Sequence, residues 1–78
     1  MGNIFSGNPT FEFTLWYLDG DRVLVVKSPE IYRTPQAAYK AGKRHCRHVG
    51  NPLVISFEQY NRGRVKHLGV YKVTRNDM

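Results

Sequence analysis

The sequence predicts a small α+β domain with the element order β-β-α-β-β, in which one helix packs across one face of an antiparallel sheet. Two pairs of β-rich segments each surround a turn sequence, and a single segment between the pairs has the periodicity and end signals of a helix. With 78 residues, of which 41% are hydrophobic, the chain has room for one core. We therefore expect one domain over residues 11–73, a loose N-terminal lead over 1–10 and a frayed tail over 74–78.

The first predicted hairpin joins residues 11–18 to residues 21–28 through Asp19-Gly20. Asp-Gly between two β-rich runs is typical of a two-residue hairpin turn. This turn would place Leu15 opposite Leu24. The residues expected on the core face are Phe11, Phe13, Leu15, Leu24 and Val26.

The other face of this hairpin carries Trp16, Val23 and Val25, and it is less polar than a freely solvated sheet face. We expect this face to be covered by the N-terminal lead or to contact a partner.

The predicted helix begins after Thr34, a natural N-cap, with Pro35 in its first turn, and it stops before Gly50. A helical period of about 100° per residue separates two faces. The small face, expected to pack on the sheet, consists of Ala38, Ala41, Gly42, His45 and Val49. The opposite, wholly basic face consists of Lys40, Lys43, Arg44 and Arg47.

A second hairpin is predicted where residues 53–59 and 65–73 alternate around a polar loop. If Tyr60 lies opposite Val65, then Phe57 lies opposite Leu68 and Ile55 opposite Val70, and these residues join the core. The face away from the core would show Glu58, Tyr60, His67 and Tyr71. The basic tip would consist of Arg62, Arg64 and Lys66.

The net charge of +6 is unevenly distributed along the chain. Residues 1–32 carry two basic and four acidic side chains, whereas residues 33–78 carry ten and two. Such asymmetry creates a one-sided positive field that attracts nucleic acid, an acidic protein surface or anionic lipid. The alternative is that the charge only keeps the protein dispersed.

The pattern of acids, histidines and cysteine gives no reason to expect an enzyme, a cofactor or a bound metal. The carboxylates have no spacing that would pair two of them for acid-base catalysis. His45, Cys46 and His48 point in divergent directions on a helix, and no zinc-type spacing or phosphate-binding glycine loop occurs. We expect Cys46 to be structural.

The lone cysteine favours a reducing compartment, and the sequence has neither an apolar run that could span a bilayer nor the features of a signal peptide. We expect a cytoplasmic protein, located in the host cytoplasm if it is viral. Membrane contact is not expected unless Gly2, which with Ser6 fits an N-myristoylation pattern, is acylated.

Two functional hypotheses follow, and both leave the oligomeric state open. The first is a non-enzymatic basic module that engages nucleic acid or a nucleoprotein through the helix face and hairpin tip, by Lys40, Lys43, Arg44, Arg47, Arg62, Arg64 and Lys66. The alternative is a viral- or phage-type accessory or inhibitor protein that binds a larger host protein through the sheet face around Trp16. Its candidate interface residues are Trp16, Val23, Val25, Tyr60 and Tyr71.

Overall fold

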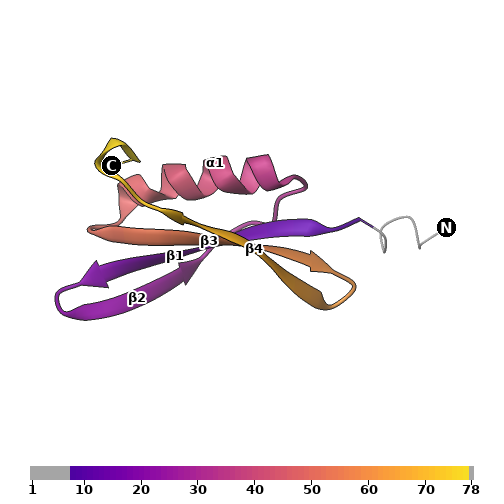
Figure 1. The fold of residues 1–78 in the computed structure, drawn as a ribbon, viewed down its shortest axis with the longest axis horizontal. Helices are drawn as coiled ribbons and strands as arrows, with labels where there is room; N and C mark the ends of the chain where they lie inside the picture. The colour runs from indigo at the N-terminus through magenta and orange to yellow at the C-terminus, as the bar shows by residue number, and fades with distance from the viewer. Residues whose placement is uncertain (1–7, 78) are drawn as a thin grey trace.

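The computed structural model describes residues 8–77, which form one antiparallel sheet, one α-helix and two short 3-10 helices. The strands are β1 (Thr10–Asp19), β2 (Arg22–Lys27), β3 (Pro52–Asn61) and β4 (Arg64–Lys72), and the helices are α1 (Pro35–His45), η2 (Cys46–His48) and η3 (Arg75–Asp77). The sheet order is β2-β1-β3-β4, and α1 lies across one face (Figure 1). The predicted fold class and element order are confirmed.

The turn between β1 and β2 lies one residue later than the sequence predicts. Asp19 pairs with Arg22, so Gly20 and Asp21 form the loop, and Leu15 lies opposite Val26 instead of Leu24. The reason is conformational: Gly20 has a φ of +67°, and placing it first in the loop lets Asp19 keep an extended conformation. The pairing shifts by an even number of residues, so the predicted core face of this hairpin is retained.

The second hairpin follows the prediction near its turn and departs from it further along. Tyr60 pairs with Val65 as predicted, around a turn in which Arg62 and Gly63 both have positive φ, 53° and 78°. Between the Glu58–His67 pair and the Phe57–Gly69 pair, Leu68 is an extra residue. The predicted pairing of Phe57 with Leu68 is therefore wrong.

Beyond this β-bulge, each side chain of β4 points to the face of the sheet opposite to the predicted one. Ile55 pairs with Tyr71 rather than Val70, so Tyr71 lies on the α1 side and packs against the core. Leu68 and Val70, expected in the core, are 40% and 60% exposed. Tyr71 therefore does not belong to the face around Trp16, where the sequence had placed it.

The core lies between α1 and the central strands β1 and β3. Phe13, Leu15 and Ile55 are fully buried, and α1 covers them with Ala38 and Ala41, which are also buried. The predicted N-cap is confirmed, because the Thr34 hydroxyl accepts a hydrogen bond from the Ala37 N–H at 3.1 Å.

Gly42 explains how α1 comes so close to the sheet. A Cβ at this position would lie 3.1 Å from Cγ2 of Ile55 and 3.3 Å from Cγ of Phe13. Glycine costs about 1 kcal/mol relative to alanine inside a helix, and the tight helix-sheet contact compensates for that cost. The predicted packing of the small helix face is confirmed for Ala38, Ala41 and Gly42.

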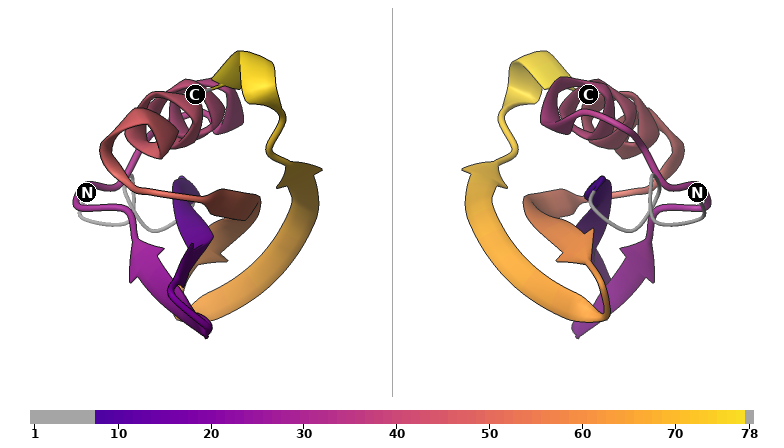
Figure 2. Two further views of the ribbon diagram at one scale, coloured as in Figure 1. Left: turned by 90° about the vertical axis from the view of Figure 1, so that its left-hand side faces the viewer. Right: turned by 90° about the vertical axis from the view of Figure 1, so that its right-hand side faces the viewer.

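The described chain joins the sheet at Thr10 and ends in η3. Thr10, expected as the last residue of the N-terminal lead, is the first residue of β1, and Phe11 exchanges two 2.8 Å backbone hydrogen bonds with Tyr32. At the other end, η3 returns to the side of α1, as the end-on views in Figure 2 show. The N-myristoylation pattern at Gly2 lies outside the described residues.

Candidate nucleic-acid interface

The basic residues predicted on the outer face of the helix gather around one hollow of about 440 Å³. We call Lys40, Lys43, Arg44 and Arg47 the helix patch. The side chains of Lys40, Arg44 and Arg47 are exposed. Tyr39 and the η3 residues Asn76 and Asp77 complete the lining. The sequence predicted the basic residues but not the contribution of the C-terminal turn.

Lys43 differs from the other members of the helix patch because it is held by its neighbours. Its Nζ lies 3.2 Å from Oδ1 of Asp77. The same ammonium lies 5.2 Å from the ring centre of Tyr39 and 5.1 Å from that of Tyr71, within the range of cation–π attraction. Lys43 therefore joins α1 to the C-terminal turn, in addition to any contact with a ligand.

Asp77 is the acceptor that organises this end of the chain. Its Oδ2 accepts hydrogen bonds from the Thr74 N–H at 2.9 Å, the Thr74 hydroxyl at 3.0 Å and the Tyr71 hydroxyl at 2.8 Å. Residues 74–77 are thus bound to α1 and β4, in contrast to the frayed tail that we expected. The spacing Thr74-x-x-Asp77 is a local turn signature that could have indicated this.

The same contacts keep both Asp77 and Lys43 charged. The Thr74 N–H, followed by the Tyr71 and Thr74 hydroxyls and Lys43, holds the pKa of Asp77 far below its usual value. Hydrogen bonding to Asp77 is the main cause that raises the pKa of Lys43. Both groups are charged at neutral pH, so Asp77 offsets one positive charge of the helix patch. Within residues 8–77, no carboxylate lies at ion-pair distance from Lys40, Arg44 or Arg47.

The second basic group, which we call the hairpin patch, consists of Arg62, Arg64 and Lys66 at the β3–β4 turn. These side chains border a hollow of about 740 Å³ with Gln59, Asn61 and Val65. Figure 1 shows this turn at the end of the molecule where α1 begins, bent toward the side of the sheet away from α1. The helix patch lies on the C-terminal half of α1 and, with Arg47, on η2. The structure does not bring the two patches into one continuous surface.

The face of the sheet away from α1 holds most of the predicted protein-interface residues. Trp16 pairs with Val25 on one side and Val54 on the other, and it is 38% exposed. Its indole N–H donates to the Ser56 hydroxyl at 3.4 Å. Val23 and Tyr60 share this face, whereas Tyr71 does not.

Two polar contacts on this face were not predicted from the sequence. Lys27 Nζ donates to the Tyr60 hydroxyl at 2.8 Å, and this hydrogen bond is the main cause that raises the pKa of Lys27. Glu58 accepts a 3.0 Å hydrogen bond from the Thr14 hydroxyl. Both contacts join strands far apart in the chain, so no local sequence signal could reveal them.

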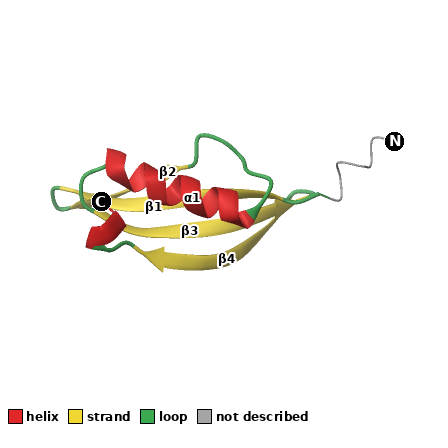
Figure 3. Cartoon of the chain, turned by 90° about the horizontal axis from the view of Figure 1, so that it is seen from above, coloured by secondary structure: helices red, strands yellow, loops and turns green. Residues whose placement is uncertain are grey.

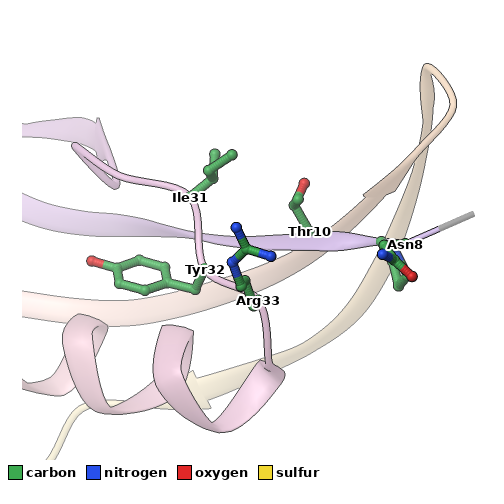
Figure 4. Close-up of a pocket in the computed structure, with 6 residues that line it drawn as sticks. Asn8, Thr10, Ile31, Tyr32 and Arg33 are labelled. Atoms are coloured by element: carbon green, nitrogen blue, oxygen red, sulfur yellow. The ribbon is translucent and has the colours of Figure 1, made fainter. Parts of the chain in front are cut away.

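Cys46, the single cysteine of the chain, is free and belongs to the core cluster. Burial raises the pKa of the Cys46 thiol, and only 1% of this residue is exposed. Within residues 8–77, no three His, Cys, Asp or Glu side chains gather as metal ligands would. A hollow of about 510 Å³ lies beside the start of β1. Figure 4 shows that two residues on its border, Ile31 and Tyr32, point to opposite sides of the connecting segment, so these side chains do not converge.

Comparison of the chain with protein-family models, curated proteins and solved structures found no match. The described residues form a small α+β domain in which α1 covers one face of a four-stranded antiparallel sheet. In residues 8–77, no helix is both long enough and apolar enough to cross a membrane.

Proposed function

We propose that this protein is a non-enzymatic module that binds nucleic acid, alone or within a nucleoprotein, through the helix patch. The observation that carries the proposal is the exposure of Lys40, Arg44 and Arg47 around one hollow on one side of α1. Cations spaced along a helix suit the regular phosphates of a nucleic-acid backbone and bind them without reading sequence. Tyr39 at the border supplies a ring on which an unpaired base can stack.

The hairpin patch is a second contact in this proposal. Arg62, Arg64 and Lys66 add three positive charges at a protruding turn, where a groove or a bent strand can reach them. Because the two patches lie apart, the helix patch alone should hold short oligonucleotides.

The test is a salt titration of oligonucleotide binding by fluorescence anisotropy. Arg44→Glu combined with Arg47→Glu should weaken binding more than about tenfold at about 50 mM salt. It should also reduce the slope of log affinity against log salt by roughly one unit per lost phosphate contact. Lys43 is left intact, since its change would also release Asp77.

Arg22→Glu combined with Arg33→Glu is the matched control. It changes the net charge by the same amount at exposed positions outside both patches. An equal loss of affinity in the control would mean that only net charge matters. The absence of any binding by the wild type at about 50 mM salt would refute the proposal.

A second candidate is a protein partner bound through the sheet face around Trp16, as an accessory or inhibitor protein of viral or phage type would bind. The observation that favours it is a partly exposed Trp beside the exposed valines Val23 and Val25. Trp16→Ala should then cost about 2 kcal/mol or more of affinity for the protein partner. The same variant should leave nucleic-acid binding unchanged, which distinguishes the two functions.

A further inference from the structure

The strand β4 is an edge of the sheet whose outer side is open in the described part of the chain. It follows β3 in the order β2-β1-β3-β4, and Figure 3 shows none of the described elements beyond it. From Gly69 to Lys72 it pairs regularly with β3. An edge strand of this kind presents unpaired backbone groups to which another strand can add.

The backbone groups that point outward can be assigned from the ladder. The Val73 N–H donates to the Leu53 carbonyl at 3.0 Å, so Val73 faces β3. Because N–H groups alternate along a strand, Tyr71 also faces β3, whereas Val70 and Lys72 direct their N–H and C=O groups outward. Val70 and Lys72 are thus two successive outward-facing residues, and both lie beyond the bulge at Leu68.

An apolar groove of about 320 Å³ runs beside this part of the edge. Pro35 and Tyr39 of α1 line it together with residues of the sheet, which are Phe57, Leu68, Gly69, Val70 and Tyr71. Gly69 leaves the groove open, because no atom lies within 4 Å of the place where its Cβ would be. The ring centre of Tyr39 lies 5.6 Å from that of Phe57 and 5.5 Å from that of Tyr71, so the Tyr39 side of the groove is preformed.

The charge of β4 selects among possible occupants. The strand carries the cationic residues Arg64, Lys66 and Lys72 and no acidic residue. A second copy paired through β4 would bring together two strands whose charged side chains are all cationic, which is unfavourable. A strand with acidic side chains would instead be attracted.

We propose that β4 and the groove beside it bind an extended acidic peptide segment of another protein as an added strand. Its backbone would pair with the outward groups of Val70 and Lys72. Apolar side chains on one face of the peptide would enter the groove at Leu68 and Tyr39, and the acidic side chains on the other face would lie near Lys72. This site does not depend on the proposed nucleic-acid function, although Tyr39 borders both hollows.

The test uses isotope-labelled full-length protein and a synthetic peptide of about seven residues that alternates glutamate with leucine. Saturable shifts in the NMR spectrum should appear at Val70 and Lys72, and hydrogen exchange of these amides should slow by about tenfold or more. The same peptide with lysine in place of glutamate should bind at least about tenfold more weakly. A glutamate peptide with N-methylated backbone amides should not bind.

Two variants of the strand separate backbone pairing from charge. Val70→Pro removes an outward N–H without touching the ladder to β3, and it should abolish peptide binding. Val25→Pro is its matched control, because Val25 holds the equivalent outward position on the other edge strand, β2. Leu68→Glu and Leu68→Lys both remove an apolar side chain from the groove. Only Leu68→Glu should also repel the acidic peptide, so it should lower the peptide affinity more than Leu68→Lys does.

Several results would overturn the proposal. They are the absence of saturable shifts at Val70 and Lys72, and equal peptide affinity in Val70→Pro and the wild type. Amide protection that rises with protein concentration in the absence of peptide would assign the edge to a second copy. Displacement of the peptide by a duplex oligonucleotide, with protection of the same amides, would assign it to nucleic acid.

Discussion

Gly42 shows at the scale of one residue how a locally unfavourable choice serves the fold. The atoms that a Cβ would meet belong to Ile55 and Phe13, and these side chains are 0% and 1% exposed. Fully packed side chains cannot move aside without disturbing their own neighbours. The glycine therefore sets the distance between α1 and the sheet.

Gly42→Ala should destabilise the protein by about 1 kcal/mol. The gain in helix propensity is about 1 kcal/mol, and overpacking costs about 1–3 kcal/mol, so the steric cost is expected to prevail. Urea unfolding measures the difference. Gly69→Ala is the matched control, because its Cβ would meet nothing within 4 Å, and it should change the stability by less than about 0.5 kcal/mol. A stabilised Gly42→Ala variant would contradict this account of the contact.

Cys46 is expected to be chemically inert in the folded protein. Its side chain belongs to the core cluster, and burial raises its pKa, so little thiolate is present at neutral pH. A thiol reagent should label the native protein far more slowly than the denatured protein, with the rate recorded by absorbance. Rapid labelling of a folded sample would show that Cys46 is accessible and would reopen a reactive role.

At the scale of elements, the C-terminal turn η3 is fixed by a single carboxylate. Asp77→Asn should lower the melting temperature, because the amide cannot accept the charge-assisted contacts from Thr74, Tyr71 and Lys43. Since folding lowers the pKa of Asp77, its stabilising contribution is full above the ordinary carboxyl pKa of 3.8 and declines as the pH falls below that value.

Acid unfolding of the two proteins measures this contribution. The difference in stability between the wild type and Asp77→Asn should be constant near neutral pH and should shrink as the solution becomes more acidic than about pH 4. Asn76→Ala, in the same turn but outside the hydrogen bonds of Asp77, is the control and should show no such pH dependence. A difference that stays constant in acid would mean that Asp77 is not the group responsible.

The elements themselves were accessible from the sequence, whereas some of their relations were not. The N-cap at Thr34 and the alternation in the strands are local signals, and they predict the elements correctly. The bulge at Leu68 and the clustering of Asp77 with Lys43 depend on contacts between distant parts of the chain. One extra residue in β4 was enough to move Tyr71 from the predicted interface to the helix side.

At the scale of the whole molecule, the positive charge occupies two places rather than one. The sequence predicted both groups of cations, but it could not place them relative to each other, since their separation depends on the twist of the sheet. The described chain extends over 49 Å along its longest axis, with the helix patch and the hairpin patch toward different ends. A ligand must therefore be long, or must bend, to contact both.

This separation predicts a dependence of binding on oligonucleotide length. One strand of duplex DNA advances about 3.4 Å per base pair, so spanning the long axis takes on the order of 14 base pairs. A duplex of about six base pairs should lose affinity when Arg44 and Arg47 are changed to Glu, and it should be nearly insensitive to Arg64→Glu combined with Lys66→Glu. With about 20 base pairs both pairs of changes should weaken binding, and each should reduce the salt slope. Fluorescence anisotropy over a series of lengths measures the effect. Equal sensitivity of the shortest duplex to both pairs of changes would mean that the patches act as one surface in solution.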